Sequence, residues 1–331
     1  MQSSIKTPER SADSRSVARH AVSRPELLRR FLQAYWLRPE NALWMTLRSE
    51  ALSAVCLETP CLDLSCGDGI FTFLHCGGVF DPVFDVFTAV DRLDRVRDEH
   101  VDMFDCVDSS YQPHIQERAG QSIDVGTDLK SSLLGKAKTL GLYGRLVEHD
   151  NNTPLPFEDS TFQTVYCNSA YWVTEVDLFL EQINRVTQPD GRIVLHVKLD
   201  AMRRFNLGAY EDVLGARFLE IIGRGRLDTW QALAGRSEWE DRFARAGLTI
   251  VDATPFVTRT HAHLWDIGLR PIAPMLVRMA AGLTPKTRAS IKRDWVDLFC
   301  ELLLPFCKPD VDLLGGHTEP AEIQYVLART S

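Results

Sequence analysis

The stretch CLDLSCGDGIF, residues 61–71, has the pattern of a buried strand that runs through a glycine turn into a helix. Gly67 and Gly69 allow the turn positive φ angles and let a ligand approach the backbone where no Cβ intervenes. Such a turn at the carboxyl end of a parallel strand is a frequent site for nucleotide-like cofactors. A dinucleotide fingerprint would need a third glycine at Thr72. The stretch therefore predicts an α/β cofactor site and disfavours a nicotinamide cofactor.

Apolar runs of strand length alternate with helical patterns along the rest of the chain. The expected strands are 61–65, 122–128, 145–150, 162–169, 191–199, 248–257 and 322–329. Helical patterns follow the second and fourth of them, at 129–141 and 176–188. Strands that alternate with helices indicate a parallel sheet covered on both faces. We therefore predict an α/β fold with a doubly wound, mostly parallel, seven-stranded sheet.

The spacing of these strands also predicts how the chain is divided. We expect a disordered tail at 1–23, an N-terminal helical cap at 24–58, and a single domain at 59–331 with insertions at about 77–120, 200–235 and 258–318. Long insertions at the rim of an α/β sheet often serve function. These segments are therefore candidates to cover a ligand.

Composition excludes several other classes. The chain has 331 residues, a net charge of −8 and 45% hydrophobic residues, and this acidic balance disfavours a nucleic-acid partner. The eight cysteines form no CxxC pair, so neither a zinc site nor a disulfide scaffold is indicated. No uninterrupted apolar run reaches the roughly 18 residues of a membrane span, and the first residues lack a secretory signal. We expect a cytoplasmic protein without a metal.

Acidic and amide residues stand at the ends of the next strands. Asp128 ends the second strand, where a carboxylate can accept from both hydroxyls of a ribose. Asp150 and Asn168 follow the third and fourth strands. The run at 83–91 could itself form the second strand, with Asp91 as the acid. We favour Asp128, because its interval to Asp150 fits one helix and one strand.

Four motifs in this order resemble those of the class I S-adenosylmethionine-dependent methyltransferases, particularly the ubiquinone and menaquinone methyltransferase group (methyltransferase type 11). They are LDLSCGDG (62–69), VGTDLKSSLLGKA (125–137), HDNNTPLPFEDSTFQTVYCN (149–168) and RVTQPDGRIVLHV (185–197). The similarity covers about 60–200 and the last two strands. It implies a Rossmann-like methyltransferase fold, S-adenosylmethionine as cofactor and S-adenosylhomocysteine as product.

The resemblance also implies roles for individual residues. The methionine end of the cofactor would be held by Asp63 and the 65–69 backbone, the ribose by Asp128, and the adenine by Leu129 and Asp150. The full implied set is Asp63, Ser65, Cys66, Gly67, Gly69, Asp128, Leu129, Asp150, Asn151 and Asn168. Ser65 departs from the pattern, since it replaces the first glycine of the turn. We expect serine to be tolerated there, because it is small. The interval from Asp150 to Leu155 is one residue longer than in the pattern, which bears on the adenine contacts.

Methyl transfer needs placement more than elaborate catalysis, although an acceptor hydroxyl or carbon benefits from a general base. No base is identified by the sequence, and the candidates are His261 and His263 in the late insertion. His149 and His196 lie within or beside strands, so we interpret them as structural. Tyr35 and Arg38 could close over the carboxylate of the cofactor.

The acceptor is expected to be a small molecule or a glycan or lipid precursor, with oxygen, nitrogen and carbon all open as the methylated atom. The resemblance places Tyr171 and Trp172 in the acceptor pocket. The late insertion combines basic and apolar residues, so 258–310 could contact a membrane surface. An alternative is a cofactor-binding partner module that has lost catalysis.

Overall fold

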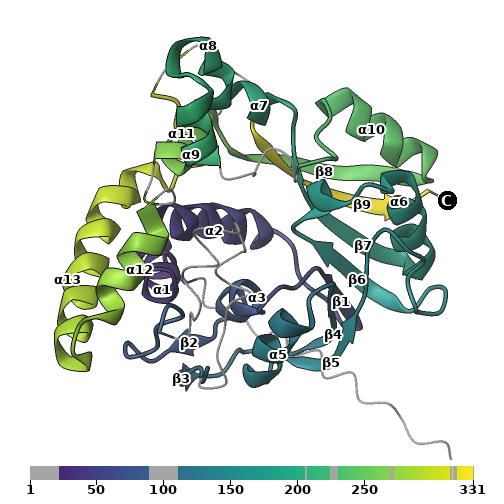
Figure 1. Ribbon diagram of the computed structural model, residues 1–331. Helices are drawn as coiled ribbons and strands as arrows, with labels where there is room; N and C mark the ends of the chain where they lie inside the picture. The colour runs from purple at the N-terminus through teal and green to yellow at the C-terminus, as the bar shows by residue number, and fades with distance from the viewer. Residues whose placement is uncertain are drawn as a thin grey trace, which may run out of the picture.

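The computed structural model describes residues 22–330 except 89–110, 206, 224–229, 268, 270–271, 314 and 316–318. Within these residues the core is a seven-stranded sheet in the order β5-β4-β1-β6-β7-β9-β8 (Figure 1). Its strands are β1 (Cys61–Leu64), β4 (Ile123–Asp128), β5 (Tyr143–Glu148), β6 (Phe162–Cys167), β7 (Thr187–Lys198), β8 (Leu248–Val257) and β9 (Glu322–Arg329). Only β9 runs antiparallel to its neighbours. The predicted fold is therefore confirmed.

The glycine-turn strand β1 lies at the centre of the sheet. It pairs in parallel with β4 on one side and β6 on the other. All four of its residues are buried, as a strand covered on both faces requires. Asp63 lies opposite Gly126 of β4. The strand that pairs with β1 on this side is therefore the predicted strand that ends at Asp128. The alternative acid, Asp91, lies outside the described residues, as does the predicted tail up to residue 21.

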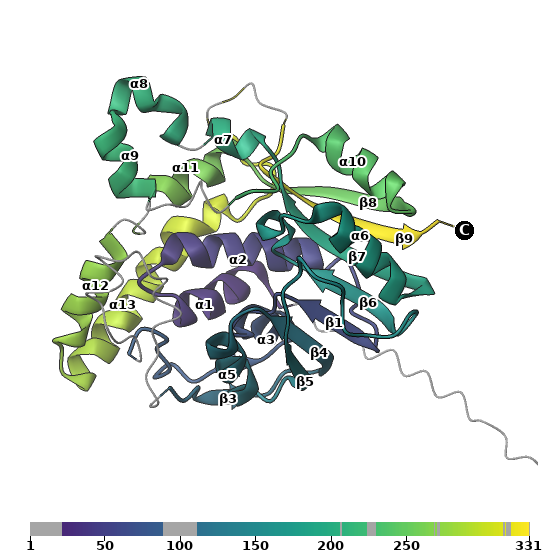
Figure 2. The same ribbon diagram turned by 45° about the vertical axis from the view of Figure 1, so that its right-hand side comes forward.

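The helices cover both faces of the sheet (Figures 1 and 2). On one face lie α2 (Pro39–Leu52), α3 (Ile70–His75) and α5 (Ser131–Thr139), and on the other lie α6 (Val176–Val186) and α10 (Arg236–Arg245). The apolar stripe of α6 is buried at Val176, Phe179, Leu180, Ile183 and Val186. This spacing follows one side of a helix, so the periodicity in the sequence sets which side packs on the sheet.

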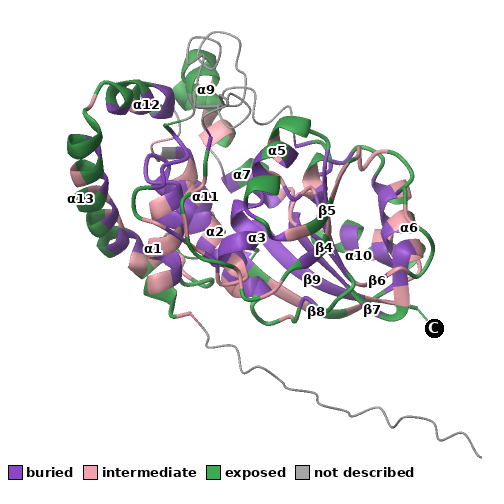
Figure 3. Cartoon of the chain, turned by 90° about the horizontal axis from the view of Figure 1, so that it is seen from below, coloured by how far each residue is buried: buried purple, intermediate pink, exposed green. Residues whose placement is uncertain are grey.

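A helical layer from both ends of the chain lies beside the sheet. It contains α1 (Arg24–Ala34), α11 (Arg259–Ile267), α12 (Ala273–Ala281) and α13 (Pro285–Leu303). Arg29 of α1 pairs with Asp297 of α13 at 2.5 Å, and the rings of Trp36 and Trp295 meet edge to face. Exposed residues follow the outer side of α13 (Figure 3). The cap and the late insertion thus pack as one layer.

The other two insertions contain short elements. Strands β2 (Val79–Phe80) and β3 (Ile115–Glu117) form a small antiparallel pair at the base of the first. The second contains α7 (Ala201–Phe205), η2 (Leu207–Tyr210), α8 (Glu211–Leu214) and α9 (Ala216–Gly223). The predicted strand at 191–199 begins earlier, at Thr187. Thr187 pairs with Phe162 of β6, and the register shifts before Thr164 pairs with Arg192.

Candidate functional site

In the turn after β1, every second residue has a left-handed backbone conformation. The φ angles of Ser65, Gly67 and Gly69 are 57°, 61° and 76°. A Cβ at Gly67 would meet no atom within 4 Å, whereas one at Gly69 would lie 3.0 Å from Leu140 and Tyr143. The N–H groups of Cys66 and Gly69 donate to the carbonyl oxygens of Thr127 and Cys66, and that of Gly67 donates to Asp128. The turn is thus open beside Gly67 and packed tightly at Gly69.

Ser65 takes up the conformation for which glycine is the usual residue. A non-glycine residue in the left-handed region costs about 1–2 kcal/mol. Its hydroxyl oxygen accepts a hydrogen bond from the side-chain amide of Asn151 at 2.9 Å. This bond connects the turn to the loop after β5 and offsets part of the backbone cost.

The carboxylate of Asp63 is buried beneath this turn. Its Oδ2 accepts hydrogen bonds from Thr72 Oγ1 at 2.7 Å and Tyr143 OH at 2.8 Å. Its Oδ1 has no hydrogen-bond partner among the described residues. Burial raises the pKa of Asp63 to about 6, the charge of Asp128 adds to the rise, and the two hydrogen bonds oppose it. Asp63 therefore supports the turn from within, and its contact with a cofactor stays a prediction.

Asp128 joins the end of β4 to the turn. Its Oδ2 accepts from the backbone N–H of Gly67 at 3.0 Å, and its Oδ1 accepts from that of Lys130 at 2.9 Å. The neighbouring Leu129 is 60% exposed. A carboxylate beside an exposed apolar side chain suits a nucleoside, whose ribose needs hydrogen-bond acceptors and whose base needs an apolar surface.

The loop after β5 is fixed by its own amide and carboxylate groups. Asp150 Oδ1 accepts from the backbone N–H and the side-chain amide of Asn152, both at 2.9 Å. Asn152 Oδ1 accepts in turn from the backbone N–H groups of Thr174 and Glu175. Together with the hydrogen bonds from Asn151 to Ser65 and from Gly67 to Asp128, this loop links the ends of β1, β4 and β5 into one rim.

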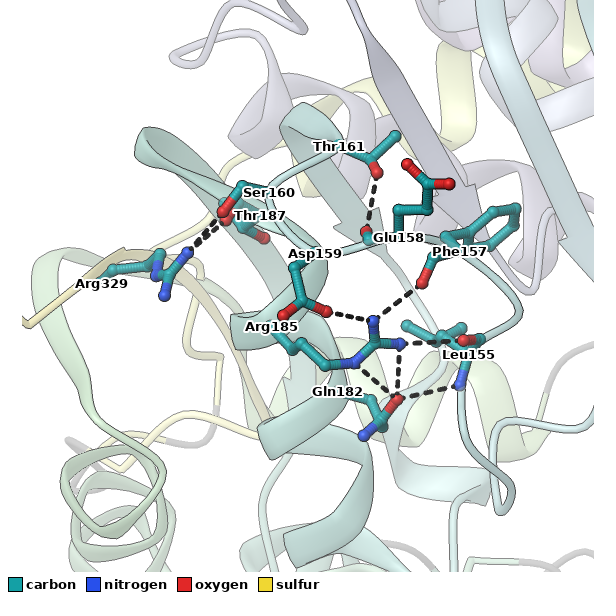
Figure 4. A network of polar contacts seen from close by, with 10 residues as sticks. All are labelled: Leu155, Phe157, Glu158, Asp159, Ser160, Thr161, Gln182, Arg185, Thr187 and Arg329. Carbon is teal, nitrogen blue, oxygen red and sulfur yellow. Dashed lines mark hydrogen bonds and ion pairs between the residues drawn. The ribbon is translucent and has the colours of Figure 1, made fainter.

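Arg185 of α6 holds the Leu-Pro-Phe segment (155–157) that follows the loop after β5, as Figure 4 shows. Its guanidinium donates to the carbonyl oxygens of Leu155 and Phe157 at 2.9 and 2.8 Å, and it pairs with Asp159 at 2.7 Å. Gln182 accepts from both Arg185 and the N–H of Leu155. Sequence reasoning missed this residue. The only signal in the sequence was that Arg185 stands in the last turn of the predicted helix that became α6.

The predicted acceptor residues lie directly after β6. Asn168 is half-buried, and η1 (Ala170–Trp172) follows it. Trp172 is 51% exposed, and its ring lies 5.8 Å from that of the half-buried Tyr171. These two rings form an apolar edge beside the carboxyl ends of the strands.

The candidate bases differ in the partners of their rings. His261 accepts at Nδ1 from the N–H of Thr258 at 3.0 Å, and its Nε2 donates to the carbonyl of Phe306 at 2.8 Å. Both nitrogens are thus engaged, and neither is available to take a proton. His263 Nε2 is buried with no hydrogen-bond partner among the described residues, and burial lowers the pKa of His263.

His196 belongs to the core. Its Nε2 lies 2.9 Å from Gln324 Oε1, and its Nδ1 lies 3.2 Å from Tyr166 OH. Gln324 donates its amide to the carbonyl of Ala51, so its oxygen accepts from Nε2 and Nδ1 accepts from Tyr166. Burial lowers the pKa of His196 well below its usual value. The structural interpretation of His196 is confirmed. His149 is half-buried, and burial lowers its pKa.

The cap residues expected near the carboxylate of the cofactor are both buried. Arg38 pairs with Glu40 at 2.5 Å. Burial raises the pKa of Tyr35 well above its usual value, and the charge of Asp68 adds to the rise. Within the described part of the chain, no three His, Cys, Asp or Glu side chains gather as metal ligands. No helix described there is long and apolar enough to cross a membrane.

Part of this chain is similar in sequence to known proteins. A family profile described as a methyltransferase domain matches residues 106–195, which begin within the insertion that follows β1 and run from β3 into β7. Demethylmenaquinone methyltransferases from Bacillus cereus and Bacillus anthracis are 28% identical over 163 residues, or 44% of this chain and 67% of theirs.

Two solved structures are also similar to this chain. YcgJ from Bacillus subtilis has a TM-score of 0.41 at 14% identity, with 86% of this chain and 98% of that chain covered. Geranyl diphosphate C-methyltransferase from Streptomyces coelicolor has a TM-score of 0.41 at 9% identity, with 88% and 84% covered.

Proposed function

We propose that this chain, a class I S-adenosylmethionine-dependent methyltransferase, transfers the methyl group to a small-molecule acceptor at the carboxyl edge of its sheet. Glycan and lipid precursors are among the candidate acceptors. The observation that carries the cofactor site is the hydrogen bond from the N–H of Gly67 to Asp128 Oδ2. This bond brings the left-handed turn, the carboxylate and the exposed Leu129 to one rim.

The residues of this rim suggest how the cofactor would be held. When bound, S-adenosylmethionine supplies a sulfonium methyl group that is already activated for in-line displacement. The turn at 65–69 would bind the methionine end, Asp128 the ribose, and Leu129 the adenine, with Asp150 and Asn151 at the adenine edge. Placement of the acceptor in line at about 3–3.5 Å can lower the barrier by roughly 7–11 kcal/mol.

We infer that Tyr171 and Trp172 form the acceptor wall, because they follow β6 next to Asn168 and one of them is exposed. His263 is the better of the two histidine candidates for a base. Its Nε2 has no hydrogen-bond partner among the described residues, and a neutral ring near physiological pH can accept a proton.

Asp128→Asn tests the cofactor site. The exchange keeps the shape of the side chain and removes its charge, so S-adenosylhomocysteine should bind more weakly by about 1.5–3 kcal/mol, or roughly 10–150-fold. Calorimetric titration of both proteins measures this difference.

Asp294→Asn is the matched control, because it removes the same charge from an exposed site on α13. Unchanged affinity in Asp128→Asn, or no binding to the wild type, would contradict the proposal. Turnover of labelled cofactor with a panel of acceptors then separates an active enzyme from an inactive partner module.

We also propose that the late insertion contacts anionic membranes. On α12, Met275 and Met279 are 64% and 68% exposed one helical turn apart, and Arg278 lies exposed beside them. Apolar side chains with nearby cations suit the boundary of an anionic bilayer.

The protein is therefore expected to sediment with anionic liposomes at low salt and to remain in the supernatant with neutral ones. The double exchange Met275→Ser and Met279→Ser should abolish sedimentation. Val251→Ser, at a 55% exposed position on β8, is the control. Wild-type protein recovered only in the supernatant would rule out this surface.

A further inference from the structure

Two cations of α13 join the late insertion to the first insertion. Arg288 Nε donates to Asp85 Oδ2 at 2.8 Å. Lys292 Nζ donates to the carbonyl oxygen of Pro82 at 3.1 Å and to that of Phe84. The three charged side chains are buried. We call these contacts between α13 and the loop of the first insertion the insertion latch.

The loop that the insertion latch holds is ordered by Asp85. Its Oδ1 accepts from the backbone N–H of Phe87 at 2.9 Å, and its carbonyl oxygen accepts from the N–H and the hydroxyl of Thr88 at 3.1 and 2.8 Å. Directly before the loop, the ring of Phe80 lies 4.9 Å from that of Phe73 in α3. The insertion latch therefore fixes a loop whose other end packs against the helix that begins at the glycine turn.

The N-terminal cap reaches the insertion latch through an uncharged ring. The guanidinium of Arg288 lies 5.7 Å from the ring centroid of Trp36, at the bend between α1 and α2. The charged groups that face Lys292 are Arg288 on its own helix and Asp81 and Asp85 on the loop.

The ammonium form of Lys292 is disfavoured in the insertion latch. Among the described residues no carboxylate lies within ion-pair distance of Nζ, since Asp85 pairs with Arg288 instead. The hydrogen-bond partners of Nζ are two neutral carbonyl oxygens. A neutral amine has a donor for each of them, whereas an ammonium brings a charge that burial penalises. The closed arrangement therefore favours uncharged Lys292.

We propose that the insertion latch is a pH-dependent device that holds the two insertions together more firmly once Lys292 has lost its proton to solvent. The neutral amine keeps both hydrogen bonds to the loop and leaves Arg288 and Asp85 as a balanced ion pair. The inference concerns the opening of the protein itself, so it does not depend on the proposed function.

The direction of the effect follows from where Lys292 binds its proton. Burial lowers the pKa of Lys292 from its ordinary value of 10.5 to about 8, while the charges of Asp85 and Asp81 oppose the fall and that of Arg288 adds to it. In an open latch the side chain is in water and regains its ordinary pKa. Between these two values the open state binds more protons than the closed one, so opening becomes less favourable as the pH rises. Below about pH 8 both states are charged, and the latch is at its weakest.

Hydrogen exchange of the loop amides at 84–88 tests the inference on the full chain. The readout is their protection in the wild type divided by that in Lys292→Met, which cannot titrate. This ratio should rise about tenfold between pH 7 and pH 9, and it cancels both the intrinsic pH dependence of exchange and the other titrating groups. The loop amides should also be less protected than those of β6, because the latch opens while the sheet stays folded.

Two further variants complete the test. Lys292→Arg stays charged over this range, so its protection should lack the rise, and it replaces Lys292→Met as the reference if that variant does not fold. Lys286→Met removes an exposed charge from the first turn of the same helix and should keep the pH dependence of the wild type.

Three results would overturn the inference. A ratio that stays constant between pH 7 and pH 9 would show that Lys292 does not titrate with the latch. Equal protection of the loop and of β6 would show that the loop opens only when the whole protein unfolds. Loop amides without protection would show that the latch is not closed in solution.

Discussion

Gly69→Ala is expected to lower the free energy of unfolding by about 2–5 kcal/mol. The φ angle of Gly69 is 76°, and a residue with a Cβ loses about 1–2 kcal/mol in this region. The added methyl group would also lie 3.0 Å from Leu140 and Tyr143 and 3.3 Å from Ala137, and such overpacking costs about 1–3 kcal/mol. Urea unfolding measures the sum.

Two other glycines separate the backbone cost from the packing cost. Gly67 has a φ of 61° but open space around its Cβ position, so Gly67→Ala should lose only the roughly 1–2 kcal/mol of the backbone. Gly135 lies exposed in α5 with open space, so Gly135→Ala should gain about 0.5–1 kcal/mol. A loss in Gly69→Ala no larger than in Gly67→Ala would refute the packing argument.

Local patterns in the sequence sufficed to predict the sheet. Each strand is a short apolar run between turn residues, and the glycine turn and the acid at Asp128 stand at strand ends that a parallel sheet must bring together. The bond between Gly67 and Asp128 is the direct consequence. The alternation of strands with helices then leaves few ways to arrange the sheet.

Contacts between distant segments could not be predicted in this way. Lys198 and Glu322 meet because β7 and β9 pair antiparallel, and periodicity does not reveal that register. His261 had the residue type of a base, but its nitrogens bind the backbone of Thr258 and Phe306. The partner of Asp63 was equally hidden. Tyr143 belongs to β5, which is separated from β1 by β4 in the sheet. In each case the residue type was visible and its partner was not.

Asp63 should make the stability of the protein fall as the pH rises from about 4 to above 6. Burial raises the pKa of Asp63 from its ordinary value of 3.8 to about 6. Between these values the folded protein binds more protons at this site than the unfolded chain, so the free energy of unfolding decreases with pH. A shift of about two pKa units corresponds to roughly 3 kcal/mol in total.

Asp63→Asn isolates this contribution, because asparagine keeps an oxygen that can accept from Thr72 and Tyr143 but cannot ionise. The stability of the variant relative to the wild type should rise by up to about 3 kcal/mol between pH 4 and pH 8. Taking the difference between the two proteins cancels the other titrating groups. Thr72→Val should move the transition to higher pH, since the hydrogen bond from Thr72 lowers the pKa of Asp63. A difference between Asp63→Asn and wild type that does not change with pH would show that Asp63 titrates normally, and its burial would then carry no electrostatic cost.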